Sequence, residues 1–249
     1  MPRQYKSLPR AFVDAPLAPG GEVTVDADHA NHLVNVLRLA PGDAAILFNG
    51  HDGAWLGKLL KANKKGATFE LAVQTSHQTP PSDLWFGFAP LKTGRLDYVI
   101  QKATEMGASV IQPVITEFTQ VRRLRADKLS AYVLEAAEQC EVLTIPQLAE
   151  ETDLAPLLAN WRTTQGLRRL LFADESAPSA TPAETISWLE GLPVGILVGP
   201  EGGFSDAERK LLLAQDFVVP ISLGPRILRA DTAAVAALTL VQAIIGDWR

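Results

Sequence analysis

Two segments near the C-terminus combine glycine, proline and charged side chains as ligand-binding loops do. The first is VGPEGGFSDAE, residues 198–208, and the second is LGPRILRADTA, residues 223–233. Glycine lets a backbone approach a ligand closely, and the planar guanidinium of arginine suits phosphate or carboxylate groups. Neither segment has the Gly-Lys-Ser/Thr of a triphosphate-binding loop. The pair predicts a site for an organic ligand, although two ordinary tight turns would share this spacing.

The charged side chains of these segments are the candidates for chemistry. Glu201, flanked by glycines, could accept a proton or a hydrogen bond from a ligand, or it could be a solvated turn residue. Arg226 and Arg229 could bind an anionic group, or they could neutralise Asp231 and Glu201 at the surface. Thr232 could cap the last helix or offer a hydroxyl group to a ligand.

Both segments must be positioned by the strands that precede them. Apolar, β-branched runs at 195–198 and 217–223 predict two strands, and a helix signal follows each loop. We therefore expect the two loops to lie side by side at the carboxyl edge of one sheet, where open α/β folds bind ligands. A third polar segment, ADES at 173–176, follows another strand-like run and fits the same edge.

The region from residue 84 onward alternates strand and helix patterns, which predicts an α/β fold with a parallel sheet covered by helices. Ser205 and Glu208 form a capping-box signal, and Gly107 is a helix stop signal. Cys140 falls on an apolar helix face, so a buried thiol is expected. The expected strands are 85–91, 110–115, 170–173, 195–198 and 217–223, and the expected helices include 96–106, 129–140 and about Thr232 to Ile245.

Residues 1–75 have a different pattern, with short strands separated by turns. Strands are expected at 22–25, 44–48, 54–60 and 68–73, with one helix at 27–37 capped by Asp26 or Asp28. This pattern predicts a small β-barrel. The polar, proline-containing stretch 76–83 is the natural linker, so we expect domains at 1–75 and 84–249.

The composition limits the class of protein. The chain has 249 residues, 47% hydrophobic and 20% charged, as in soluble globular proteins. Its one cysteine excludes an intramolecular disulfide, and its four histidines have no metal-motif spacing, so no metal site is expected. The first residues lack the apolar core of a signal peptide, and no apolar stretch is long enough to span a bilayer. A cytoplasmic location without membrane contact is expected.

The charge distribution points to one basic patch in an acidic protein. The net charge of −5 argues against a nonspecific nucleic-acid coat. Residues 1–75 carry eight Lys/Arg against seven Asp/Glu, a balance of +1, whereas residues 76–249 carry fifteen against twenty-one, a balance of −6. The densest positive run contains Arg122, Arg123 and Arg125. It could be a solvated surface or a contact for an RNA backbone.

The two C-terminal segments resemble those of the RsmE family, and the resemblance extends over essentially the full chain. Members methylate N3 of a uridine in small-subunit ribosomal RNA with S-adenosylmethionine. The resemblance implies a SPOUT-type parallel sheet with a C-terminal trefoil knot, a homodimer, and a PUA-like N-terminal barrel that binds RNA. Further stretches that carry it are RAFV at 10–13, HLVNVLRLAPGD at 32–43, QKATEMG at 101–107, QPVITE at 112–117 and EAAEQC at 135–140.

The resemblance also implies roles for individual residues. Arg229 or Arg226 would stabilise a uracil anion, with Glu201 as a candidate base and no metal. The substrate would be small-subunit ribosomal RNA within an assembled subunit. S-adenosylmethionine would lie against Ala173, Leu197, Gly199, Gly203, Leu223, Gly224, Ile227, Leu228 and Thr232, and RNA would contact Arg10, His32, Arg38, Arg122, Arg123 and Arg125.

The chain departs from the family pattern at three places. Cys140-Glu141-Val142 stands where Ser-Gly-Arg is usual, Phe118 replaces a basic residue, and Asp231 replaces a glutamate. The first two changes remove positive charge near the expected RNA face. Two alternatives stay open from sequence alone: a related methyltransferase with another target such as tRNA, and an RNA-binding module without catalysis.

Overall fold

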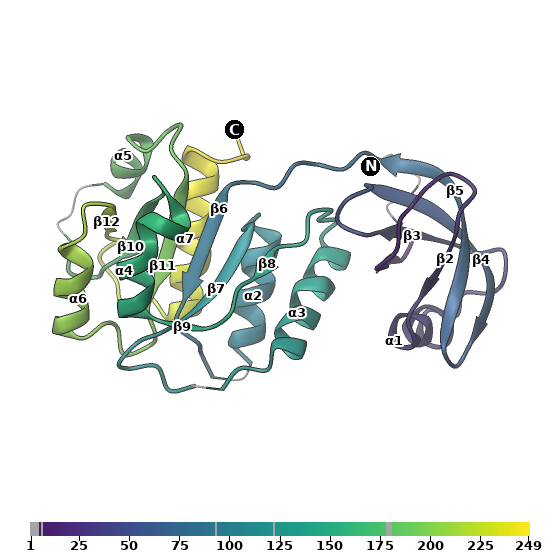
Figure 1. Cartoon of the computed structure of the whole chain (residues 1–249), viewed down its shortest axis with the longest axis horizontal. Coiled ribbons are helices and arrows are strands. Elements are labelled where there is room, and N and C mark those ends of the chain that lie inside the picture. Colours follow the sequence, from purple (N-terminus) through teal and green to yellow (C-terminus); the bar gives the residue numbers. More distant parts are fainter. Residues whose placement is uncertain (1–4, 6, 93, 122, 178–180) are drawn as a thin grey trace. The chain divides into compact units, whose positions relative to one another are not determined.

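The computed structural model of the protein describes residues 5, 7–92, 94–121, 123–177 and 181–249. It divides into two compact units (Figure 1). The N-terminal unit comprises Met1–Pro80 and Ala137–Ile145, and the C-terminal unit comprises Pro81–Ala136 and Pro146–Arg249. The N-terminal unit therefore includes a segment from the region that we expected to form the second domain.

The N-terminal unit is built on a five-stranded sheet with the order β1-β3-β4-β5-β2. The four strands expected from sequence are confirmed, with β4 and β5 longer than expected, and β1, which pairs parallel with β3, was missed. Register shifts along the β4–β5 pair bend these two long strands. The strands are β1 (Arg10–Phe12), β2 (Glu22–Val25), β3 (Ala44–Phe48), β4 (Ala54–Asn63) and β5 (Gly66–Ser76).

The expected helix at 27–37 is present in two pieces. An α-helical turn, α1 (Ala27–Ala30), continues as the π-helix η2 (Asn31–Val36). Asp26 caps the start, because its side chain accepts a hydrogen bond of 2.9 Å from the backbone N–H of His29. Beyond the end, Arg38 has a φ of 63°, a left-handed conformation that turns the chain away.

His29 joins this helix to the segment 137–145 within the N-terminal unit. Its Nδ1 lies 2.8 Å from Asp26 Oδ1, and its Nε2 lies 2.9 Å from Glu138 Oε1. Glu138 Oε1 also accepts a hydrogen bond of 2.8 Å from the backbone N–H of Phe12. The hydrogen bond to Glu138, supported by Asp26 and opposed by burial, raises the pKa of His29 to about 9.

The expectation of a buried Cys140 is wrong. Helix α3 (Ala126–Gln139) ends one residue before it, and Glu141 adopts a φ of 59°. Cys140 therefore lies past the apolar face that the helical periodicity defined, and its side chain is exposed.

The C-terminal unit contains a seven-stranded parallel sheet, which confirms the expected α/β architecture. The strand order is β12-β10-β11-β6-β7-β8, with β9 also pairing with β7. The central strands β6 and β11 are buried along their whole length, as expected for a sheet covered on both faces. The strands are β6 (Leu84–Phe88), β7 (Val110–Ile115), β8 (Gln147–Leu148), β9 (Thr152–Asp153), β10 (Arg169–Ala173), β11 (Val194–Val198) and β12 (Val218–Ile221).

Two groups of helices cover this sheet (Figure 1). Helices α2 (Leu96–Glu105) and α5 (Pro182–Ser187) pack against α7 (Ala230–Ile244), whereas α4 (Leu154–Gln165) packs against α6 (Asp206–Leu213). Within the described residues, no helix is both long and apolar enough to cross a bilayer.

One predicted helix cap is confirmed, and another is not present. The Ser205–Glu208 capping box at the start of α6 is confirmed. Thr232 does not cap α7, because the helix begins at Ala230 and Arg229 occupies the N-cap position. Neither α4 nor α5 was predicted from sequence.

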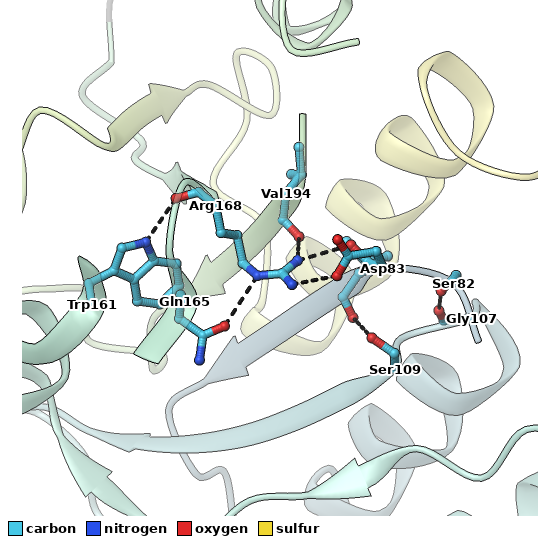
Figure 2. A network of polar contacts seen from close by, with 9 residues as sticks. Ser82, Asp83, Gly107, Ser109, Trp161, Gln165, Arg168 and Val194 are labelled. Carbon is cyan, nitrogen blue, oxygen red and sulfur yellow. Dashed lines mark hydrogen bonds and ion pairs between the residues drawn. The ribbon is translucent and has the colours of Figure 1, made fainter. Parts of the chain in front are cut away.

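A polar network around Arg168 fixes the amino ends of the central strands (Figure 2). The Arg168 guanidinium donates to the carbonyl oxygens of Val194 (2.9 Å) and Asp83 (3.0 Å), and it pairs with the Asp83 carboxylate. The indole N–H of Trp161 donates to the Arg168 carbonyl at 2.9 Å. Since Asp83 immediately precedes β6, this network ties the strand to the start of β11.

The His29 cluster predicts a pH-dependent stability. The pKa of about 9 in the folded protein exceeds the ordinary value of 6.5. The stabilisation is therefore complete below pH 6.5 and is lost as the pH rises through 9. We expect His29→Gln to lower the free energy of unfolding by about 1–2 kcal/mol at pH 6, after allowance for solvent screening. Urea denaturation at pH 6 and pH 9.5 measures this, and an equal deficit at both pH values would contradict it.

Candidate functional site

A pocket lies at the carboxyl ends of three neighbouring strands in the C-terminal unit. The last residues of β10 and β11 and the loops that follow β10, β11 and β12 supply most of its lining, within 173–176, 198–204 and 223–228. Its volume is about 230 Å³. The loops after β11 and β12 do share one site, as their sequences predicted. Their strands are not neighbours, however, because β10 lies between them and adds the third loop.

Most of the predicted cofactor residues line this pocket. Leu197 is instead buried within β11, and Thr232 is exposed in the first turn of α7. Arg229 is exposed at the N-cap of α7 and is not part of the lining. The predicted residues in the lining are Ala173, Gly199, Glu201, Gly203, Leu223, Gly224, Arg226, Ile227 and Leu228.

Glycine is required at several points of the pocket wall. Gly203 has a φ of +69° and Gly224 a φ of +110°, conformations that other residues adopt only with strain. A Cβ at Gly199 would lie 2.6 Å from the ring of Phe204. That ring packs edge-on against Phe172, with centroids 5.0 Å apart, so the first loop folds onto its own aromatic side chain.

An ion pair with a buried carboxylate ties the loop after β10 to helix α6. The Asp174 side chain is only 4% exposed, and its carboxylate accepts hydrogen bonds from Arg209 Nε (3.0 Å) and from the backbone N–H of Ser176 (3.0 Å). The carboxylate in turn raises the pKa of Arg209. The segment ADES therefore lies at the predicted edge, and part of its acidity is used to hold the loop. The partner, Arg209, was not identified from sequence.

Glu208 links the first pocket loop to the loop after β7. Besides its capping-box bond to Ser205 N (3.0 Å), its other oxygen accepts a hydrogen bond of 2.8 Å from the backbone N–H of Glu117. The next residue, Phe118, lies against the glycine loop, since a Cβ at Gly202 would be 3.2 Å from the Phe118 Cβ. Phe118 is 43% exposed at this place.

Arg95, at the N-cap of α2, is a member of the site that sequence reasoning missed. Its guanidinium lies 3.3 Å from Glu201 and 3.9 Å from Asp231. Arg95 therefore neutralises the two carboxylates for which Arg226 and Arg229 were considered. Neither of those arginines has an ion-pair partner among the described residues. The available sequence signal was the position of Arg95 soon after β6, the strand next to β11.

The pocket combines apolar, backbone and charged groups. Phe172, Val198 and Leu228 give it apolar walls, whereas Glu175, Glu201, Asp206 and Arg226 bring charge. Such a lining suits an organic ligand that carries both an apolar part and charged ends. In the part of the chain that the structure describes, no three His, Cys, Asp or Glu side chains cluster as metal ligands.

The sequence of this chain is similar to those of known proteins. The sequence matches an RNA methyltransferase domain family over residues 78–242 and an RNA methyltransferase PUA domain family over residues 25–72. It is 33% identical to ribosomal RNA small subunit methyltransferase E of Rickettsia conorii over 94% of both chains.

The chain belongs to the RsmE family.

Solved structures resemble the whole chain as well. A ribosomal RNA small subunit methyltransferase E from Neisseria gonorrhoeae bound to S-adenosylmethionine is 26% identical, with a TM-score of 0.83 over 97% of this chain and 100% of that one. A Legionella pneumophila protein in complex with the same cofactor is 28% identical, with a TM-score of 0.80 over 95% and 97% of the two chains. The resemblance to the RsmE family seen in the sequence is confirmed.

The RNA-contact residues predicted for this RsmE-family chain have different environments. His32 and Arg38 are exposed around η2, and Arg123 and Arg125 are exposed before α3, where Arg125 pairs with Asp127. Arg122 lies outside the described residues. The guanidinium nitrogens of Arg10 are buried, with no hydrogen-bond partner among the described residues.

Two further observations describe Arg10. The guanidinium lies over the ring of Phe48 at 5.1 Å, and burial lowers its pKa. In this structure Arg10 therefore presents no nitrogen at the surface.

The Asp174–Arg209 pair predicts a stability effect at the pocket. Arg209→Met leaves the buried Asp174 carboxylate without its charged partner, so we expect the free energy of unfolding to fall by more than the loss of an exposed ion pair causes. As a control, Arg162→Met breaks the pair with Asp216, which is 81% exposed, and should change stability little. Urea denaturation compares the two variants. Equal small effects would show that the pair does not fix the loop after β10.

Proposed function

We propose that the protein transfers a methyl group from S-adenosylmethionine to N3 of a uridine in small-subunit ribosomal RNA. The observation that carries this proposal is the pocket formed by three loops at the carboxyl edge of the sheet, in a chain of the RsmE family. Relatives named ribosomal RNA small subunit methyltransferase E and a neighbour bound to S-adenosylmethionine support it.

The residues of the pocket fit this cofactor. Backbone groups at Gly199, Leu223, Gly224 and Leu228 would hold its adenine and methionine parts, between the apolar walls already described. The carboxylates suit an ammonium group and a sulfonium, and Arg226 suits a carboxylate. When bound, S-adenosylmethionine supplies a methyl group already activated on a sulfonium, so positioning lowers much of the remaining barrier.

Side chains at the pocket can promote loss of the proton from uracil N3. Its N3 carries a proton at neutral pH and becomes a good nucleophile once that proton leaves. Arg226 and Arg229 have no ionic partner among the described residues, so either guanidinium is available to stabilise the uracil anion. Glu201, held by Arg95 at 3.3 Å, is the candidate acceptor of the proton.

RNA binding is assigned to two regions. In the PUA domain, His32 and Arg38 are exposed, whereas Arg10 would have to leave its buried position to contact RNA. In the methyltransferase domain the basic run Arg122, Arg123 and Arg125 is the candidate. We infer that the substrate is the RNA within an assembled small subunit.

Several finer features follow from family membership as proposals. The N-terminal sheet would close into a PUA-like barrel over 1–75, the linker would be 76–83, and the SPOUT domain 84–249 would end in a trefoil knot. The chain runs from β12 through the third pocket loop to α7, which packs beside α2 and α5. A cytoplasmic location is also proposed.

We also infer a homodimer. Helix α7 is apolar on most faces, yet Val235, Leu240 and Ile244 are only half-buried in the single chain. A second copy would cover such a surface. Static light scattering at micromolar concentration reports the mass directly, and a monomer would refute the inference.

The proposed roles predict a selective loss in Arg229→Ala. S-adenosylmethionine and RNA should still bind, while methyl transfer slows by about a hundredfold, the typical effect of losing one anion-stabilising donor. Lys210→Ala, which removes another exposed cation, is the control. The assay is mass spectrometry of 3-methyluridine in small subunits from cells lacking the activity, incubated with enzyme and cofactor.

The outcomes of this assay distinguish an incorrect proposed reaction from an incorrect catalytic role for Arg229. No 3-methyluridine with the wild-type protein, despite cofactor binding, would contradict the proposed reaction. Wild-type turnover by Arg229→Ala would remove that residue from catalysis and leave Arg226 as the candidate.

A further inference from the structure

A second cavity lies in the C-terminal unit. Its volume is about 170 Å³. It is lined on one side by Leu91, Gly94 and the start of α2, and on the other by Val121, residues 123–125 and the first turns of α3. Leu91 and Leu129 form a buried apolar floor, and Arg123, Arg125 and Lys128 add three cations to its lining. Asp97 is the one carboxylate among the residues that line it.

Some lysines and arginines of the C-terminal unit pair with carboxylates, and others do not. Carboxylates pair with Arg95, Lys102, Arg125, Arg162, Arg168, Arg209 and Arg249. Arg169 donates to the carbonyl oxygen of Asp216. The described lysines and arginines of this unit with no ionic or hydrogen-bonding side-chain partner among the described residues are Lys92, Arg123, Lys128, Lys210, Arg226 and Arg229.

The free cations gather at the two cavities. Arg123 and Lys128 line the second cavity and Lys92 adjoins it in sequence, whereas Arg226 lines the first cavity and Arg229 follows closely in the same loop. Lys210, in the last turn of α6, lines neither. In a region of net negative charge, unpaired cations concentrated at two cavities favour a ligand with repeated negative charges.

One loop connects the two cavities. Gly94 and Leu96 line the second cavity, and Arg95 between them contacts Glu201 of the first. A ligand seated in the second cavity would therefore be separated from the methyl-transfer pocket by a single loop.

We propose that the second cavity is a subsite for the RNA backbone, with a phosphate on Arg123 and Lys128 and its ribose over the apolar floor. This inference rests on the proposed function and makes it more specific. It brings Lys128 into the RNA-binding surface, and it gives Arg125 a smaller part because Asp127 already neutralises that side chain. The strand would be fixed next to the nucleotide whose base enters the first pocket.

Salt-dependent RNA binding tests the subsite. The probe is a fluorescein-labelled uridine oligonucleotide of about twelve residues, a length comparable with single-strand binding sites. We expect the double variant Arg123→Ala/Lys128→Ala to bind it about tenfold more weakly at 0.1 M salt. The slope of log K against log salt should fall by about 1.4, because each lost contact with a single strand removes about 0.7. Lys210→Ala is the matched control and should keep the wild-type slope.

Two further measurements distinguish a lost RNA contact from a damaged fold or cofactor pocket. Calorimetric affinity for S-adenosylmethionine should be unchanged in the double variant, which shows that the fold and the first pocket are intact. With small subunits as substrate, KM should rise while kcat changes little. An unchanged slope, or an equal loss in Lys210→Ala, would overturn the subsite. A failure of the wild-type protein to methylate RNA would contradict the proposed function instead, whatever the slopes.

Discussion

The parallel pairing of β10 with β11 on one side and with β12 on the other determines where this protein can bind its ligand. The registers place Phe172 opposite Leu197 and Ala173 opposite Ile221, so the three strands end at nearly the same level. Parallel strands point their carboxyl ends the same way, and three loops must therefore meet at one edge. The pairing of these buried strands thus brings three segments that are distant in sequence together in one pocket.

The loops themselves are held by a few polar contacts that cross between elements. Asp174 binds Arg209 of α6, Glu208 binds the backbone at Glu117, and Arg95 joins Glu201 to the start of α7. Asp174 is buried, so its charge would be costly to leave unpaired. The side chains of Arg95 and Glu201 are 36% and 35% exposed, so their pair positions the loop more than it stabilises the fold. Of the described cations of the C-terminal unit without such partners, all but Lys210 lie at or next to the two cavities, where an anionic substrate could reach them.

Most local signals were predicted correctly from sequence, whereas the strand order and the ion-pair partners across long separations were not. The Asp26 cap, the Ser205–Glu208 capping box and the strand at 110–115 depend on neighbours within a few residues. The order of the strands depends on pairing across long separations, so the place of β10 between β11 and β12 could not be derived. The partners Arg95 and Arg209 were missed for the same reason. Composition and spacing identified two of the pocket loops, and the family resemblance added Leu197, which is buried within its strand.

The central claim is that the three loops form the cofactor pocket, and a matched pair of glycine substitutions tests it most directly. Gly224, in the third loop, and Gly191, outside the pocket lining, both have positive φ, and at neither would a Cβ meet an atom within 4 Å. Alanine should therefore strain the backbone at both positions without a steric clash, at a cost of about 1–3 kcal/mol each. Titration calorimetry should show that Gly224→Ala binds S-adenosylmethionine at least about tenfold more weakly, a loss of about 1.4 kcal/mol in binding free energy. Gly191→Ala should keep the wild-type affinity. Equal affinity in both variants would contradict the claim.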